Sequence, residues 1–388
     1  MFLIIYLLCC SLNNVSAYLS ERINSQLPED GRLNFTGLAA KYGLQTEEFD
    51  VITEDNYILK IFHIQGDRTK PILLVPGATE SADAYIIRGN TSLSVALARE
   101  GYDLWFMNVR GKKYSRRHLN LDPHEDMAYW NFSFHEIGIY DLAANIDFVL
   151  NKTSQSQITL IGFSQGNQVW YVLGSMKPEY NGRVKAVIAL APVAFQSHAR
   201  LPESWSLLNN FLRRTGNEEL FPENSSIVTV GKAICSQLIA GANYCLNAFL
   251  FPISGYNPNE VEPEFMPVII GHSPRSVARK VIDHMVQVRN SRRFQLYDYG
   301  MAANLKKYGS TMPPEYPLKE ITTKVELLVG PNDQQAHIKD VQILKQTLSN
   351  SSYHEIDKKL WGHVDFVWGK NMNKHLFPLV LNLLKMYN

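Results

Sequence analysis

Short apolar runs separated by helix-length segments are the feature that most constrains the fold of this chain. They occur at Ile72–Val75, Leu104–Met107, Ile158–Ile161 and Val184–Ala191. Such runs are typical of parallel strands that are buried on both faces and joined by helical crossovers. The alternation therefore predicts an α/β core and argues against an all-helical or all-β protein.

The alternation is interrupted once. From Gln196 to about Met312 the strand rhythm stops, and the segment is rich in aromatic residues and proline. The alternation of strands and helices then returns. Strands are expected at Val325–Val329 and Tyr353–Ile356, and helices are expected at Ile338–Leu348 and Lys374–Lys385. One core interrupted by an insertion is the simplest interpretation.

Two local signals are sharp. The runs Asp50–Thr53 and Tyr57–Ile64 flank turn-like residues at 54–56, a pattern that predicts a β-hairpin. Ser133 and Glu136 have the spacing of a capping box, and apolar residues follow at helical intervals. A helix is therefore expected to begin after Ser133 and to extend to about residue 150.

The N-terminal segment predicts export. Phe2–Cys10 is almost wholly apolar, and the small residues Val15, Ser16 and Ala17 follow it. We interpret residues 1–17 as a signal peptide cleaved after Ala17, although the segment has no basic residue at its start. A buried strand or an uncleaved anchor is the alternative, but the run is too short to span a bilayer. A secreted or lysosomal product that is soluble after cleavage is expected.

The remaining cysteines and the sequons fit that route. Cys235 and Cys245 would lie in an oxidising compartment, where they could form a disulfide or stay as two buried free thiols. Asn131 lies in a sequon, but its neighbours Trp130 and Phe132 suggest a packed site. The candidate acceptors for N-linked glycosylation are Asn34, Asn90, Asn151, Asn224 and Asn350.

The strongest chemical signal is Gly162-Phe163-Ser164-Gln165-Gly166, which directly follows an apolar strand and directly precedes a helical pattern. A serine at a tight strand-to-helix turn needs small residues two positions away on each side, because larger side chains would collide with the neighbouring backbone. Ser164 is therefore the candidate nucleophile. Serine is weakly nucleophilic unassisted, so a base and an orienting acid must follow.

Chain order selects the partners of Ser164. Asp333 follows the strand Val325–Val329, in a loop at its carboxyl end, where functional groups collect. Asp340 is the alternative acid, but it lies in the expected helix and suggests a solvated residue. Among eleven histidines, His363 lies between the last strand and the last helix, which makes it the candidate base. His337, His354 and His375 compete from less suitable positions.

An acyl-transfer site also needs two backbone N–H groups to stabilise an oxyanion. One comes from the residue after the nucleophile, Gln165, and the other from the loop after the third strand. That loop reads Val75-Pro76-Gly77-Ala78-Thr79, and Ala78 is the candidate donor.

Charge and motif content limit the remaining possibilities. Thirty-eight basic and 37 acidic residues leave a net charge of +1, which does not predict binding to nucleic acid. The basic run 110–117 is interpreted as a polar loop. The sequence has no Walker A, dinucleotide-binding, HExxH or paired CxxC motif, so we expect neither a metal nor an organic cofactor.

Several motifs occur in order along the chain, within 51–59, 108–118, 130–148, 164–166, 313–316 and 365–369. Together they resemble the acid lipases, which include gastric and lysosomal lipases and their insect relatives. The resemblance covers nearly all of the mature chain and implies an α/β-hydrolase core with a mostly parallel sheet and a largely helical cap and lid insertion. It also implies Ser164, Asp333 and His363 as a triad and Cys235 with Cys245 as a cap disulfide.

The expected organisation is a signal peptide at 1–17, core at 18–195, cap and lid at 196–312, and core again at 313–388. Pro76 and Phe163 stand where the family usually has histidine, so we expect an active enzyme with altered acyl preference or rate. The expected function is hydrolysis of acyl glycerols or related lipid esters, with a lipid–water interface as the partner. A catalytically silent lipid-binding relative and a small-ester esterase without interfacial behaviour are the alternatives.

Overall fold

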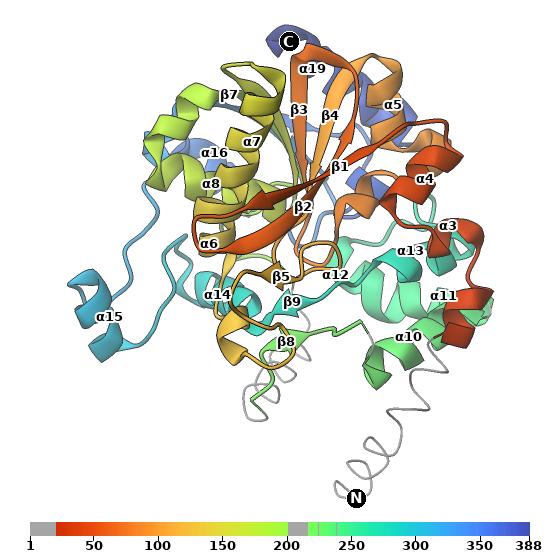
Figure 1. Cartoon of the computed structure of the whole chain (residues 1–388), viewed down its shortest axis with the longest axis horizontal. Coiled ribbons are helices and arrows are strands. Elements are labelled where there is room, and N and C mark those ends of the chain that lie inside the picture. The colour runs from red at the N-terminus through yellow and green to blue at the C-terminus, as the bar shows by residue number, and fades with distance from the viewer. Residues whose placement is uncertain (1–20, 201–215, 224, 238) are drawn as a thin grey trace, which may run out of the picture.

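A mixed sheet of nine strands lies at the centre of the structure, a computed structural model that describes residues 21–200, 216–223, 225–237 and 239–388 (Figure 1). The order is β1-β2-β4-β3-β6-β7-β10-β11, and β5 also pairs with β2. The strands are β1 Glu47–Ile52, β2 Tyr57–Ile64, β3 Asp67–Val75, β4 Tyr102–Met107, β5 Arg117–His118, β6 Ile158–Phe163, β7 Val184–Leu190, β10 Lys324–Val329 and β11 Ser351–Glu355.

The pairings follow the hydrophobic pattern. β1 and β2 form the antiparallel hairpin, whereas β4, β3, β6, β7, β10 and β11 run parallel to one another. Every residue of β4 and β6 is buried, as expected of strands covered on both faces. The α/β fold class is confirmed.

Helices cover both faces of the sheet (Figure 1). α7 and α8 lie on one face, and α5 contacts α19 on the other. The helices of the core are α3 Glu29–Arg32, α4 Phe35–Lys41, α5 Leu93–Arg99, α6 Phe134–Glu136, α7 Ala143–Thr153, α8 Gln165–Met176, α16 Ile338–Thr347, α17 Asp365–Trp368, α18 Met372–His375 and α19 Phe377–Tyr387.

The helix predicted after Ser133 begins there, with both reciprocal hydrogen bonds of the capping box present. It is interrupted by a π-helical segment, Ile137–Leu142, between α6 and α7. π-helical turns are rare and occur mostly as single turns inside α-helices, so a helical pattern in the sequence does not locate one. The sequence pattern therefore predicts the helix but not its π segment.

The segment between β7 and β10 is largely helical and lies at one end of the sheet (Figure 1). A short antiparallel pair, β8 Glu219–Leu220 with β9 Val277–Ala278, was not expected there. A disulfide joins Cys235 to Cys245 with the two Cα atoms 5.6 Å apart. The other elements are α10 Ser226–Gln237, α11 Ile239–Cys245, a π segment Leu246–Leu250, α12 Phe251–Ser254, α13 Met266–His272, α14 Arg279–Ser291 and α15 Met301–Tyr308.

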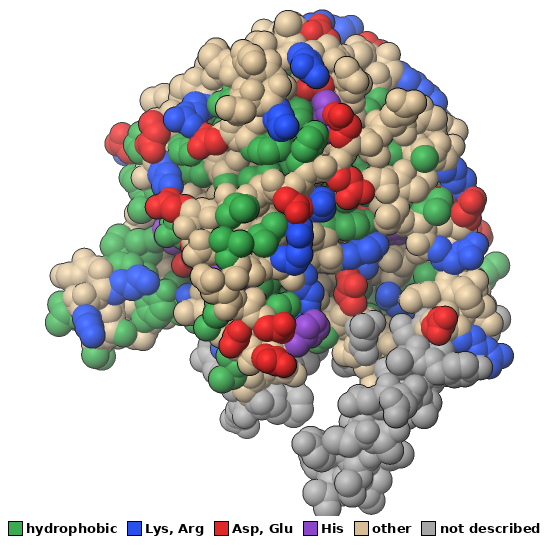
Figure 2. Space-filling model, viewed as in Figure 1, with side chains coloured by type: hydrophobic (Ala, Val, Ile, Leu, Met, Phe, Trp, Pro, Cys, Tyr) green, Lys and Arg blue, Asp and Glu red, His purple; other side chains and the backbone are tan. Residues whose placement is uncertain are grey.

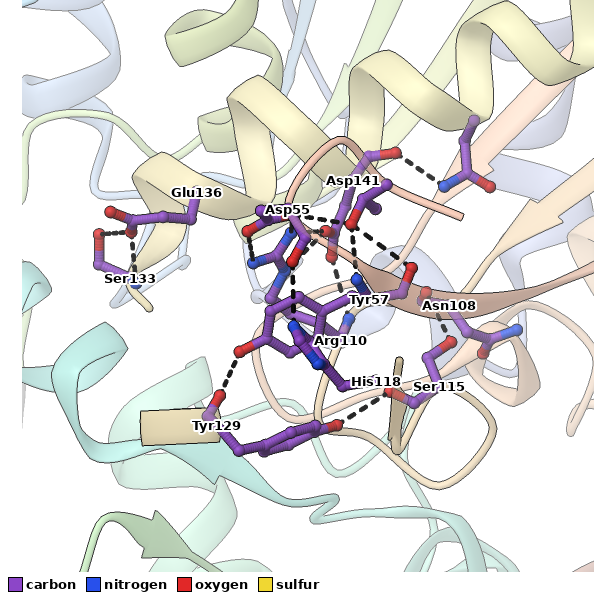
Figure 3. A network of polar contacts seen from close by, with 12 residues as sticks. Asp55, Tyr57, Asn108, Arg110, Ser115, His118, Tyr129, Ser133, Glu136 and Asp141 are labelled. Atoms are coloured by element: carbon purple, nitrogen blue, oxygen red, sulfur yellow. Dashed lines mark hydrogen bonds and ion pairs between the residues drawn. The ribbon is translucent and has the colours of Figure 1, made fainter. Parts of the chain in front are cut away.

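The interpretation of 110–117 as a polar loop is wrong at Arg110 and Lys112, which are both buried. The Arg110 guanidinium pairs with Asp141 at 2.6 Å and with Asp55 at 2.6 Å, and it lies 3.8 Å from the centre of the Tyr57 ring (Figure 3). A buried cation needs such partners. The network ties the β1–β2 turn, the loop after β4 and the π segment together.

The surface matches the near-neutral composition. On the face drawn in Figure 2, lysine and arginine side chains alternate with aspartate and glutamate side chains. Among the described residues, no helix is both long and apolar enough to cross a membrane. The expected signal peptide, residues 1–17, lies outside the described part of the chain.

Candidate active site

The turn between β6 and α8 holds Ser164 in an unusual backbone conformation, with φ 53° and ψ −116°. A Cβ atom at Gly162 would lie 2.9 Å from the backbone nitrogen of Asn167, and one at Gly166 would lie 2.2 Å from the carbonyl oxygen of Val75. The two glycines are therefore required by close backbone approach. Strain of this kind clusters at functional sites.

Ser164, His363 and Asp333 form one chain of hydrogen bonds. Ser164 Oγ lies 2.8 Å from His363 Nε2, and His363 Nδ1 lies 2.9 Å from Asp333 Oδ2. All three residues are buried, and the serine is 7% exposed. Each side chain follows the carboxyl end of a parallel strand: β6, β10 or β11. This placement brings together residues up to 199 positions apart.

Backbone groups hold the candidate acid and the candidate base. Asp333 Oδ1 accepts hydrogen bonds from the N–H groups of Gln335 and Ala336, both at 2.8 Å. The N–H of His363 donates to the carbonyl oxygen of Ser254 in α12 at 2.6 Å. The insertion therefore contributes directly to the position of the histidine.

Other histidine–carboxylate pairs show why geometry is needed to identify the site. His272 Nδ1 lies 2.9 Å from Asp83, but its Nε2 donates to the carbonyl oxygen of Asp30. His354 lies in β11 and pairs with Glu326. His363 differs from these two because its second ring nitrogen contacts a serine hydroxyl.

The alternative acid, Asp340, lies in α16 as predicted, but the expectation that it is solvated is wrong. It is buried, and it accepts hydrogen bonds from the backbone N–H and the ring of His198. The position of Asp340 in the helix predicts which side of the helix it lies on, but not which residues pack against that side. His198, which follows β7, provides that cover.

The two candidate oxyanion donors lie at the ends of neighbouring strands. Gln165 is the first residue of α8, so its N–H belongs to the group that no intrahelical carbonyl accepts. Ala78 lies in the loop that follows β3, which pairs with β6. The tip of this loop, Gly77–Glu80, is defined here as the oxyanion loop.

Lys112 is hydrogen-bonded to the backbone carbonyl oxygens of the oxyanion loop. Its Nζ donates to the carbonyl oxygens of Gly77 at 2.8 Å, Ala78 at 2.6 Å and Glu80 at 2.8 Å. Burial lowers the pKa of Lys112 to about 7, while the Glu80 carboxylate raises it and Arg275 lowers it further. Sequence reasoning missed this residue, because a lysine within a basic run carries no local sign of burial.

Phe163 and Pro76 occupy the positions where histidines were expected. The Phe163 ring lies 5.1 Å from the His363 ring, measured between centroids. A Cβ atom at Gly77 would lie 3.1 Å from the Phe163 ring and 2.3 Å from a Glu80 carboxylate oxygen. An apolar ring and a carboxylate therefore lie next to Gly77.

Glycosylation candidates differ in what the structure describes. Asn34, Asn90, Asn151 and Asn350 are exposed, whereas Asn224 lies outside the described residues. Asn131 is exposed too, although Trp130 and Phe132 are buried, and its Oδ1 accepts a hydrogen bond from Lys280. Within the described residues, no group of three or more His, Cys, Asp or Glu side chains could hold a metal ion.

Comparisons with known proteins identify the family of the chain. Residues 70–218 match the α/β hydrolase fold, and residues 35–89 match the partial α/β-hydrolase lipase region. Lipase 1 of Drosophila melanogaster is 35% identical over 92% of this chain and 81% of its own length. Human lysosomal acid lipase/cholesteryl ester hydrolase is 30% identical over 92% of this chain and 91% of its own length. The chain belongs to the acid lipase family. Like that family, it is a serine ester hydrolase.

Mouse gastric triacylglycerol lipase, another member of the acid lipase family, is 30% identical over 92% of each chain. Among solved structures, a candidate lipase from Sulfolobus solfataricus has a TM-score of 0.57 at 15% identity and covers 88% of this chain and 99% of its own. One from Acinetobacter baumannii has a TM-score of 0.51 at 14% identity and covers 90% and 95%. At such low identity these structures establish the fold alone.

Proposed function

We propose that this protein is a lipase that hydrolyses acyl glycerols or related neutral lipid esters through an acyl-enzyme on Ser164. The hydrogen-bonded chain from Ser164 through His363 to Asp333 is the observation that carries the proposal. Serine esterases use this arrangement to make a hydroxyl nucleophilic at ordinary pH.

The proposed reaction has two halves. Ser164 Oγ attacks the ester carbonyl carbon while His363 Nε2 takes the hydroxyl proton, and Asp333 orients and stabilises the resulting imidazolium. Collapse of the tetrahedral intermediate breaks the bond to the alcohol, which leaves with the proton from His363. A water molecule, deprotonated by His363, then releases the fatty acid and restores Ser164.

The oxyanion of each tetrahedral intermediate is proposed to bind the N–H groups of Gln165 and Ala78. Both donors are backbone groups, so Pro76 does not remove either of them even though proline has no N–H. Fixed donors of this kind stabilise the transition state without reorganisation. Removal of one typically lowers turnover by about 10²- to 10³-fold.

An exposed apolar surface on the insertion supports a lipid–water interface as the partner. Phe249 is exposed and stacks edge-on with Tyr244, with 5.7 Å between the ring centroids, whereas Phe251 belongs to the buried core. A contiguous exposed apolar patch marks an interaction site, and the Tyr244–Phe249 contact is where two such side chains of the insertion meet. The exposed side chains are Val230, Ile234, Ile239, Tyr244, Phe249 and Tyr256.

The domain organisation and destination form part of the proposal. Residues 196–312 would act as the cap and lid between core segments 18–195 and 313–388. Residues 1–17 would direct the chain to the secretory pathway, with a secreted or lysosomal destination. The exposed sequons and the Cys235–Cys245 disulfide support that route.

Comparing the wild type with Ser164→Ala tests the function. We expect the wild type alone to hydrolyse p-nitrophenyl butyrate and emulsified long-chain triacylglycerol. Equal activity of the two proteins would exclude catalysis at Ser164. A wild type that binds lipid but cleaves no ester would identify the silent relative. Activity that stays flat above the solubility limit of the substrate would identify an esterase without interfacial behaviour.

A further inference from the structure

Lys112 is a buried cation whose ammonium group is wholly engaged with one loop. An ammonium has three N–H donors, and here they match three carbonyl oxygens, those of Gly77, Ala78 and Glu80, at 2.6–2.8 Å. Only 2% of the residue is exposed. Burying a lysine is costly, so such a site calls for a specific explanation.

The contact with Gly77 sets the direction of the proposed oxyanion donor. The carbonyl of Gly77 and the N–H of Ala78 belong to the same planar, trans peptide unit, so they point in opposite directions. A donor that holds the Gly77 oxygen therefore turns the Ala78 N–H away from Lys112. The second contact, to the Ala78 oxygen, fixes the next peptide plane in the same way.

The charge of Lys112 acts on the same peptide. A hydrogen bond from an ionised donor is stronger than one between neutral groups, and chains of hydrogen bonds polarise one another in a low-dielectric interior. A cation bound to the Gly77 oxygen therefore makes the Ala78 N–H a better donor. The buried Glu80 side chain, next along the loop, balances part of this charge.

We propose that Lys112 is the positioning residue of the oxyanion loop: its ammonium holds the Gly77–Ala78 peptide so that the Ala78 N–H faces the developing oxyanion. The proposal rests on the proposed function of Ser164. Lys112 acts only through the backbone of the loop. It therefore contributes to turnover and not to binding of the ground-state ester.

The three hydrogen bonds from Lys112 also predict that activity depends on pH. A neutral amine has two N–H donors, so loss of one proton from Lys112 leaves one of the three carbonyls without its bond. The pKa of Lys112 is near 7, lowered by burial and by Arg275 and raised by Glu80. We therefore expect kcat/KM to fall as the pH rises above about 7, through loss of the fully bonded loop.

Lys112→Met is the principal test, with Lys113→Met as the matched control, because Lys113 Nζ lies 3.9 Å from Asp83 instead. Activity on p-nitrophenyl butyrate is measured per active site, after titration with a fluorophosphonate. We expect kcat of Lys112→Met to fall by about 10²-fold with KM within about twofold. Lys113→Met should keep the wild-type kcat. Affinity for butylboronic acid, whose serine adduct is tetrahedral, should fall with kcat in Lys112→Met.

Lys112→Gln keeps two N–H donors but does not titrate. This variant provides the test if Lys112→Met does not fold. Its kcat should be reduced at pH 6, and its profile should lack the fall above pH 7. A wild-type kcat per active site in either Lys112 variant, or an unchanged alkaline limb in Lys112→Gln, would overturn the proposal. The proposed function fails differently: wild type and Ser164→Ala would then be equally inactive.

Discussion

At the scale of single residues, chemistry depends on surroundings more than on residue type. Lys112 and Lys113 are adjacent and identical, yet Lys112 is buried against three carbonyl oxygens, whereas Lys113 Nζ lies 3.9 Å from the Asp83 carboxylate. His363 and His272 both pair with a buried aspartate, but only His363 contacts a serine hydroxyl. The role assigned to each side chain therefore depends on which atoms its polar groups contact.

Asp333→Asn tests the orienting role of the acid. An amide in place of the carboxylate favours the wrong tautomer of His363 and cannot stabilise its protonated form. We expect kcat to fall by about 10⁴-fold while the fold is retained. Steady-state kinetics and a melting curve check this. A variant within tenfold of the wild type would exclude Asp333 as the orienting acid.

His284 makes stability depend on pH. Its Nε2 donates to the carbonyl oxygen of Gln295, and burial lowers its pKa to about 3. Below pH 6.5 His284 is protonated in the unfolded chain but stays neutral in the folded protein. The free energy of unfolding therefore decreases as the pH falls from 6.5 toward 3. Asp365 acts in the opposite sense, because burial raises its pKa to about 7.

The difference between variants isolates the contribution of His284. His284→Gln should lose less Tm between pH 7 and pH 4.5 than the wild type loses, since glutamine does not titrate. Thermal melts followed by circular dichroism at both pH values measure this difference. Parallel losses in the two proteins would show that His284 is not held neutral.

At the scale of elements, apolar periodicity predicts strands well and irregular helix segments poorly. β6 and β7 begin at the residues where the sequence pattern begins. β1 begins three residues before the predicted strand, because its first residues are exposed and show no apolar run. The π segment Ile137–Leu142 and the β8–β9 pair depend on contacts between distant residues, which local patterns do not encode.

The disulfide links α10 to α11 across a sequence separation of 10. Closing so short a loop limits the unfolded chain, and its removal typically costs about 2–3 kcal/mol. The double variant Cys235→Ser, Cys245→Ala should therefore unfold at a lower urea concentration than the wild type. Reduction of the wild type with a phosphine should reproduce that shift. No change in either case would mean that the insertion is held by packing alone.

At the scale of the whole molecule, buried polar contacts join parts that lie far apart in the chain. Arg110 joins the hairpin turn, the loop after β4 and the π segment (Figure 3). The Arg88 guanidinium pairs with Glu262 of the insertion, and its Nε donates to the carbonyl oxygen of Trp368 in α17. Of these contacts, the Arg88–Glu262 pair joins the insertion to the core.

Arg110→Met compared with Arg117→Met measures what burial adds to an ion pair. Arg110→Met leaves Asp141 buried without its cation, which typically costs about 3–5 kcal/mol. Arg117 pairs with Asp50 at 2.6 Å, but its side chain is 49% exposed, so its loss should cost less than about 1 kcal/mol. Urea denaturation of both variants provides the values. Equal costs would contradict the account of the buried network.

The sequence alone determined the α/β class, the insertion, the family resemblance and the candidates Ser164, Asp333 and His363. It could do so because strand burial, the Gly162 and Gly166 spacing and chain order are local or ordered features. The tertiary structure decided the surroundings of each group. It brought Asp333 and His363 to Ser164, buried Asp340 beside His198, and placed Lys112 behind the oxyanion loop. Burial and partnership come from segments distant in sequence, so no local pattern carries them.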